Sequence, residues 1–218
     1  MSKHILFLLI FLPVTVFSQD SNLGNWINYF GNKKINDDLN WHHEVQYRNY
    51  NMVGDLEQLL LRTGIGYNLS EKNNNVLLGY GFIMSENYKS FFTDKVRVNE
   101  HRIFQQFITK QNFGRFYLQH RYRFEQRFIE GNFKMRFRYF LGLNVALNNK
   151  TLTDNTVYLS AYNEIFINDR DANFDRNRLY GAIGYKLSKV VKFELGYMNQ
   201  FFEVKGRDQL NMNVFVSF

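Results

Sequence analysis

The chain has 218 residues, of which 45% are hydrophobic and 18% aromatic, with 27 basic residues against 20 acidic ones. This length is typical of a single domain. The chain contains no cysteine, which excludes disulfide scaffolds, thiol nucleophiles and thiolate metal sites. The basic residues are spread along the sequence rather than gathered in one block, so nucleic acid is not expected as a partner.

The first segment has the pattern of a secretory signal peptide. Lys3 precedes a short apolar run, and Val16 and Ser18 stand at the −3 and −1 positions for cleavage. The run is shorter than the ~20 residues that a spanning helix needs, and no cysteine follows it for lipid attachment. We therefore expect residues 1–18 to be a signal peptide and residues 19–218 to form the mature domain.

Beyond the signal, apolar and polar residues alternate with a period of two, which predicts strands with one apolar face. Many of the alternating segments reach ten residues or more. Strands of soluble proteins most often have ~5–6 residues, whereas strands that cross a bilayer need ~9–11. The eleven predicted segments are residues 26–33, 39–50, 57–69, 76–88, 96–110, 115–128, 135–147, 156–167, 178–187, 191–202 and 209–218.

These segments predict an all-β fold, a transmembrane antiparallel β-barrel of 10–12 strands. The only proline is Pro13, in the signal, so no strand of the mature chain loses a backbone donor to proline. Bacterial barrels have even strand counts, so we expect ten strands, with the Trp26 segment not spanning, or twelve, with one strand missed. A soluble secreted β-sandwich or lipocalin-like barrel, which also alternates, is the lesser alternative.

The terminal Phe218, at the end of an alternating segment, is similar to the insertion signal that the barrel assembly machinery reads. Further motifs are Trp26 and the segments WHHEVQYR (41–48), NEHRIFQQF (99–107), HRYRFEQR (120–127), RFRY (136–139) and AYNEIFI (161–167). In these residues the chain resembles an uncharacterised domain-of-unknown-function family of outer-membrane β-barrels from Gram-negative bacteria. The resemblance implies architecture and an outer-membrane location, with no established activity.

The densest group of charged residues falls on the polar faces of four consecutive segments. Because an arginine facing lipid at the midplane costs ~2–4 kcal/mol, these side chains are expected to point into the lumen. They predict either a cationic constriction that selects anionic solutes or an internal salt-bridge ladder that fills a narrow barrel, and we favour the ladder. The cluster comprises Glu100, Arg102, Arg121, Arg123, Glu125, Arg127, Arg136, Arg138 and Glu164.

Two further motifs are weaker. Asp169, Asp171, Asn173 and Asp175 place oxygens at every second residue, as calcium loops do, but Phe174 stands where the sharp turn requires glycine, so an ordinary polar loop is favoured. No serine lies in a G-x-S-x-G context, and His43 and His120 fall on apolar faces, where headgroup contacts are more typical than catalysis. No catalytic residue, metal or cofactor is assigned.

The sequence thus predicts an integral outer-membrane β-barrel, a small or plugged channel with an arginine-rich lumen or a structural surface protein. The expected partners are outer-membrane lipids and, during biogenesis, the barrel assembly machinery. The alternative is a lipid-modifying barrel enzyme, a hydrolase that would need a Ser–His pair at the rim facing the membrane. The transported solute or substrate, the oligomeric state and any partner protein are not specified by the sequence.

Overall fold

A computed structural model describes residues 23–69, 73–89, 94–170 and 173–218, and the predicted signal peptide lies outside these residues. The described chain folds into eleven strands, which confirms the all-β prediction and all eleven predicted segments. The strands are β1 (Gly24–Lys34), β2 (Leu39–Asn49), β3 (Leu56–Asn68), β4 (Asn74–Tyr88), β5 (Lys95–Phe113), β6 (Phe116–Ile129), β7 (Asn132–Ala146), β8 (Thr156–Asn168), β9 (Phe174–Lys186), β10 (Val191–Phe201) and β11 (Gly206–Ser217).

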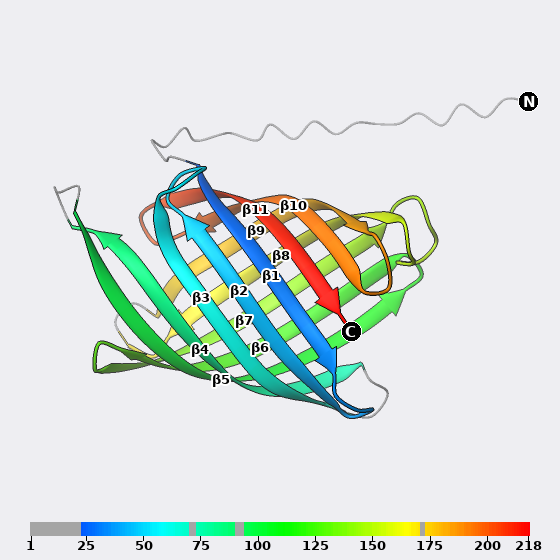
Figure 1. Cartoon of the computed structure of the whole chain (residues 1–218), viewed down its shortest axis with the longest axis horizontal. Helices are drawn as coiled ribbons and strands as arrows, with labels where there is room; N and C mark the ends of the chain where they lie inside the picture. Colours follow the sequence, from blue (N-terminus) through cyan, green and yellow to red (C-terminus); the bar gives the residue numbers. More distant parts are fainter. Residues whose placement is uncertain (1–22, 70–72, 90–93, 171–172) are drawn as a thin grey trace, which may run out of the picture.

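The strands form one closed barrel in which each strand pairs with its neighbours in sequence and β1 pairs with β11 (Figure 1). Ten of the pairings are antiparallel, but β1 and β11 run parallel, from Gly24 opposite Gln209 to Asn32 opposite Ser217. Eleven strands lie within the predicted range of 10–12, but the expectation of an even count, ten or twelve, was wrong. A parallel pair closes a barrel of odd count because its first and last strands then point the same way.

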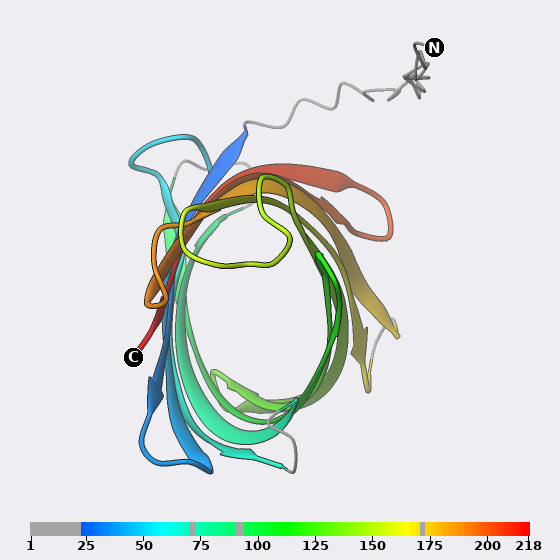
Figure 2. The ribbon, with the colours of Figure 1, turned by 90° about the vertical axis from the view of Figure 1, so that its right-hand side faces the viewer.

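The parallel pair gives the barrel two distinct ends. We call the end where β1 begins the Gly24 end, and the end where β1 and β11 both finish the Phe218 end. Figure 2 shows the Phe218 end facing the viewer, with the segment of residues 147–155 curving over part of its opening. That segment is held by the Tyr117 hydroxyl, which accepts from the Leu152 N–H at 2.8 Å, and by Lys186, which donates to the Leu152 carbonyl at 2.7 Å.

Alternation along each strand separates an apolar outside from a polar inside. On β6, Tyr122 and Phe124 are exposed, while Arg123 and Glu125, which alternate with them, are buried. The hairpin from β6 to β7 turns through Glu130 and Gly131, which both have positive φ, as the two-residue turn that matches strand twist requires. The described residues include no helix that is long and apolar enough to cross a membrane.

The interior is crowded, and glycine provides the space that its larger rings need. A Cβ at Gly184 would lie 2.2 Å from the ring of Tyr158, and one at Gly79 would lie 2.3 Å from the ring of Phe104. Both rings are almost completely inaccessible to water. Glycine on the polar face of these strands thus lets an inward ring from the neighbouring strand lie flat against the barrel wall.

Candidate functional site

A layer of buried ion pairs crosses the lumen. Four carboxylates, Glu44, Glu100, Glu125 and Glu164, are each 5% exposed or less. We call these carboxylates and the arginines paired with them the ion-pair layer. The structure places all nine charged residues of the predicted cluster in this layer, from β5, β6, β7 and β8: Glu100, Arg102, Arg121, Arg123, Glu125, Arg127, Arg136, Arg138 and Glu164.

Glu125 of β6 lies at the centre of the layer and is inaccessible to water. One of its oxygens accepts two N–H groups of Arg136, at 2.7 and 3.0 Å, and the other accepts Arg138 Nη1 at 2.8 Å. Arg102 and Arg123 approach the same carboxylate to 3.8 Å. Four guanidinium groups from three strands therefore surround one buried negative charge.

The other two predicted carboxylates join further strands. Glu164 of β8 accepts Arg138 of β7 at 2.6 Å and Arg121 of β6 at 2.7 Å. Glu100 of β5 accepts both Arg102, on its own strand, and Arg127 of β6, each through two nitrogens. Bidentate pairs of this kind combine charge attraction with a fixed geometry, so they also fix the inward side-chain positions.

The members of the ion-pair layer on β2, β3 and β9 were not predicted from the sequence. Glu44 of β2 pairs with Arg62 of β3, and Arg178 of β9 lies 3.7 Å from Glu164. The Arg178 guanidinium also stacks over the ring of Phe166. It stacks as well over the ring of Trp26 on β1, with its central carbon 5.0 Å from the ring centroid. The period-two pattern was the available signal, since each of these residues shares the polar face of its strand.

The barrel is filled at and beside the layer, toward the Gly24 end. Side chains that are 2% exposed or less come from strands around the whole wall. In a water-filled pore, the inward side chains would be accessible to water at every level of the barrel. The side chains of this set are not accessible. The set includes Leu60 on β3, Ile83 on β4, Phe104 on β5, Glu125 on β6, Phe166 on β8, and Met198 and Gln200 on β10.

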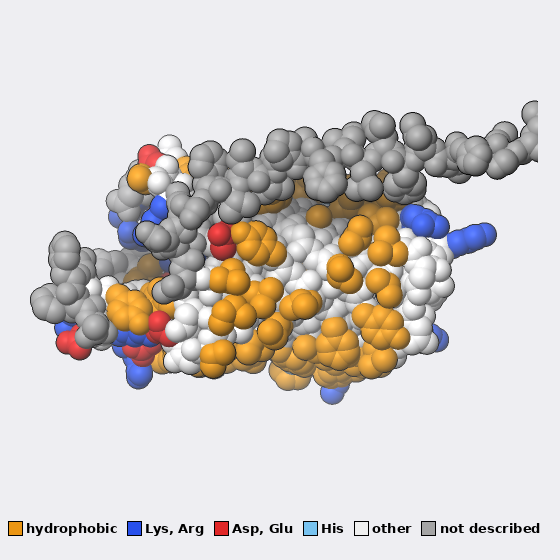
Figure 3. Space-filling view, turned by 90° about the horizontal axis from the view of Figure 1, so that it is seen from above, with side chains coloured by type: hydrophobic (Ala, Val, Ile, Leu, Met, Phe, Trp, Pro, Cys, Tyr) orange, Lys and Arg blue, Asp and Glu red, His pale blue; other side chains and the backbone are white. Residues whose placement is uncertain are grey.

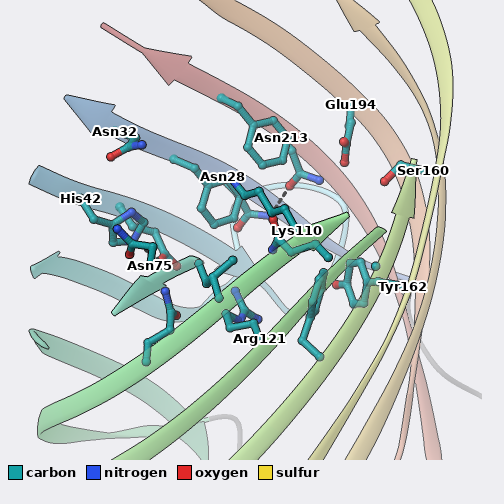
Figure 4. Close-up of a pocket in the computed structure, with 18 of the residues that line it drawn as sticks. Asn28, Asn32, His42, Asn75, Lys110, Arg121, Ser160, Tyr162, Glu194 and Asn213 are labelled. Carbon is teal, nitrogen blue, oxygen red and sulfur yellow. Dashed lines mark hydrogen bonds and ion pairs between the residues drawn. The ribbon is translucent and has the colours of Figure 1, made fainter. Parts of the chain in front are cut away.

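On the other side of the layer a cavity of about 690 Å³ opens toward the Phe218 end. We call it the lumen cavity. Arg62, Arg123 and Arg138 of the layer form its floor, and the exposed Lys34 and Phe218 lie at its rim. Figure 4 shows side chains from opposite walls pointing into this space, among them Asn28, Asn75, Lys110, Arg121, Glu194 and Asn213.

Three histidines face outward, and each is hydrogen-bonded to a tyrosine hydroxyl: His43 to Tyr29, His101 to Tyr80 and His120 to Tyr139. The fourth histidine among the described residues, His42, faces the lumen and bonds Glu44. Among the described residues no serine is hydrogen-bonded to a histidine. The lipid hydrolase alternative therefore has no Ser–His pair in the described part of the barrel.

The terminal Phe218 continues the β1–β11 seam through its backbone. Its carbonyl accepts the Lys34 N–H at 2.6 Å and its own N–H donates to the Asn32 carbonyl at 3.1 Å. Its ring is half exposed and meets the His43 ring edge-on, with centroids 5.9 Å apart. The side chain is thus free of the interior packing, while the main chain is part of the ladder.

The described residues of the candidate calcium loop do not converge. Asp169 accepts the backbone N–H of Met135 at 2.9 Å, and Asp175 turns inward to Arg136 at 2.9 Å and Arg176 at 3.2 Å. Asp171 lies outside the described residues. The structure, as far as it is described, contains no group of three or more acidic or histidine side chains suited to a metal ion. This arrangement gives the calcium hypothesis no support.

Comparison with known proteins adds a family but no activity. An uncharacterized protein of Methylorubrum extorquens is 31% identical over 193 residues, which cover 84% of this chain and 78% of that protein. No solved structure matches the chain. Residues 23–211, from the start of β1 into β11, match the family described as "Protein of unknown function (DUF2490)". The chain therefore belongs to this family of proteins of unknown function.

Proposed function

We propose that the protein is an integral outer-membrane β-barrel whose lumen is closed by the ion-pair layer, a plugged barrel rather than an open channel. The observation that carries the proposal is the burial of Glu125 among four guanidinium groups, beside side chains from other strands that water does not reach. A hydrated ion that crosses the lumen would have to displace these pairs. Because breaking a buried pair is costly, the closed state is strongly favoured.

The outer surface supports a membrane location. Figure 3 shows hydrophobic side chains over the middle of one face, with basic side chains mainly toward its ends. Exposed aromatic side chains occur near both strand ends, as in the aromatic girdles of membrane barrels, and also in mid-strand, at Tyr80, Tyr122, Phe124, Phe137 and Tyr197. A soluble barrel has the opposite distribution, with its apolar side chains inside. Those near the ends are Tyr47, Phe128, Phe133, Phe174 and Phe201 toward the Gly24 end, and Trp41, Tyr67, Phe113, Phe116, Tyr185 and Phe193 toward the Phe218 end.

Two experiments test the proposal separately. For location, the protein is expected in the outer-membrane fraction and to run faster on gels before heating than after, because a closed ladder resists detergent until it is heated. Recovery from the periplasm as a soluble monomer would refute the membrane assignment. For closure, refolded protein in planar bilayers is expected to give no stable conductance steps.

An open channel with an arginine-rich lumen is the competing function, and the same bilayer recording decides it. Regular conductance steps with a reversal potential that favours anions would replace the plugged barrel with the channel. Arg123→Ala adds a second criterion. In a channel this substitution shifts the reversal potential, whereas in a plugged barrel it alters stability and leaves the bilayer silent.

A further inference from the structure

The lumen cavity carries a large excess of positive charge. Of the described residues that line it, nine are lysine or arginine and three are glutamate. The three glutamates are Glu44, Glu164 and Glu194, and the first two are already bonded to arginines of the ion-pair layer. A cleft with one sign of charge and low-dielectric walls concentrates ions of the opposite sign. The cavity is therefore attractive to anions.

Two lysines on opposite sides of the cavity are not used by the ion-pair layer. Lys110 of β5 and Lys192 of β10 both line the cavity, and neither ammonium group has a hydrogen bond or ion pair with any described residue. Lys192 rests 4.2 Å above the ring of Phe215, and its ammonium group is attracted by Glu194 more strongly than it is repelled by Lys110. Both lysines add positive charge to the cavity wall, and an anion placed between them would be attracted by both.

Unpaired donors and acceptors on buried side chains also border the cavity. Arg123 Nη1, Asn28 Oδ1 and Asn211 Nδ2 are buried without a hydrogen-bond partner among the described residues, and each of the three side chains is 4% exposed or less. Asn28 donates to Asn213 at 2.7 Å, which leaves its own oxygen available. Buried polar atoms normally have partners, so these three are unsatisfied groups of the cavity wall, although water does not reach them.

The remaining wall is rich in amides and contains flat aromatic surfaces. Asparagine and glutamine both donate and accept hydrogen bonds, which matches ligands with many hydroxyl groups. The rings of Phe30 and Phe215 stack with centroids 5.0 Å apart and border the same space. Aromatic faces pack well against the apolar face of a sugar ring. A volume of about 690 Å³ lies within the range of small-molecule sites.

We propose that the lumen cavity binds an acidic saccharide, a sugar of one or a few rings that bears carboxylate or phosphate groups. Lys110 and Lys192 hold the acidic groups, the amides of the wall bond ring hydroxyls, and the Phe30–Phe215 pair packs against the sugar. The ligand enters from the Phe218 end, where the cavity opens. This inference goes beyond the closed-barrel proposal and does not depend on it, because binding is measurable in detergent micelles without a membrane.

The protein has a built-in reporter for the test. Of its two tryptophans, Trp26 lines the cavity and Trp41 faces outward. In a Trp41→Phe background, fluorescence therefore reports on the cavity alone. Digalacturonate is titrated as the carboxylate probe and galactose 6-phosphate as the phosphate probe, with the neutral disaccharide of galactose and inorganic phosphate as comparisons. We expect at least one acidic sugar to bind at least tenfold more tightly than either comparison, and more weakly as salt is added.

Variants assign the binding to the two lysines. Lys110→Gln with Lys192→Gln should weaken binding of the acidic sugar at least tenfold, whereas Lys33→Gln, an exposed cation on the outer face near the same end, should change it less than twofold. Glu194→Gln should tighten binding, since it removes an acidic group from the wall. Its remaining oxygen accepts from one of the Tyr158 and Tyr180 hydroxyls, and its amide NH2 donates to the oxygen of the other. A gain of affinity cannot arise from misfolding, so this variant separates charge from damage.

Four results would overturn the proposal: no response to either acidic sugar at millimolar concentration, equal binding by the double lysine variant, equal binding of the neutral disaccharide, or phosphate ion alone binding as tightly as the sugars. Conductance in bilayers bears only on the closed barrel. A silent bilayer with no sugar binding would refute this inference alone, and an open pore with charge-dependent sugar binding would refute the plug alone.

Discussion

Neutralising Glu125 should destabilise the barrel more than any comparable change at an exposed pair. Glu125→Gln keeps the shape of the side chain but removes the charge that Arg136 and Arg138 share through three hydrogen bonds of 2.7 to 3.0 Å. The amide nitrogen that replaces one carboxylate oxygen is itself a hydrogen-bond donor, and it would face an N–H donor of Arg136 or Arg138. Loss of one partner of a buried ion pair costs ~3–5 kcal/mol, and complete burial places this site in that range.

The two guanidinium groups keep other partners, which limits the effect. Arg136 remains bonded to Asp175 at 2.9 Å and Arg138 to Glu164 at 2.6 Å, so the barrel should still assemble. The matched control is Glu86→Gln, the same chemical change in a half-exposed pair with Arg97, where the Arg97 side chain is 62% exposed and the Glu86 side chain 17%. Exposed pairs contribute ~0–1 kcal/mol.

The assay is urea unfolding of refolded protein in detergent, followed by the gel shift between folded and unfolded forms and by tryptophan fluorescence. A second variant combines Glu125→Gln with Arg136→Met, and its loss should be smaller than the sum of the two single losses by more than ~1 kcal/mol, because the charges are removed together. The reasoning fails if Glu125→Gln costs no more than Glu86→Gln, or if the two single losses add without coupling.

Three further outcomes are expected. Arg123→Ala should lower the free energy of unfolding by ~1–3 kcal/mol, because Arg123 donates two N–H groups to the Gln106 side chain and its loss leaves a neutral acceptor, not a carboxylate, unpaired; a loss above that range in urea titrations would contradict this assignment. Outside the spanning strands, partial burial raises the pKa of Asp55, but the hydrogen bonds from Lys95 and Tyr88 and the charges of Lys95 and Arg207 together outweigh it and hold this pKa below its ordinary value. The contribution of Asp55 to stability is therefore present above pH ~4 and is lost as the pH falls, so Asp55→Asn should be destabilising at pH 7 and neutral near pH 2 in the same unfolding assay. Phe218→Asp should reduce the amount of folded protein in outer membranes while leaving the urea midpoint of refolded protein nearly unchanged, since only the backbone of Phe218 belongs to the ladder; equal membrane levels would show that the ring is not an assembly signal.

The sequence was sufficient for the strands and for which side chains face the lumen, because side chains alternate strictly across a strand. The positions of Arg123 and Glu125 followed from this alternation alone. Closure did not follow, since a period of two carries no information on which strand pairs with β1 or in which direction. The division of the lumen into a filled half and a cavity did not follow from the alternation either. Lys110 and Arg102 share one face of β5, and only the position along the strand and the reach of residues on other strands decide which of them is paired.

The odd number of strands also gives the chain a sidedness that an even count cannot produce. A barrel with an even number of hairpin-connected strands returns its last residue to the side from which its first residue started, whereas here the chain enters at one rim and leaves at the opposite one. In a bilayer, the backbone before Gly24 and the backbone of Ser217 would therefore face different compartments. Because the protein has no cysteine, single thiols introduced by Leu23→Cys and Ser217→Cys would be unique handles, each reachable by an impermeant label from one side only.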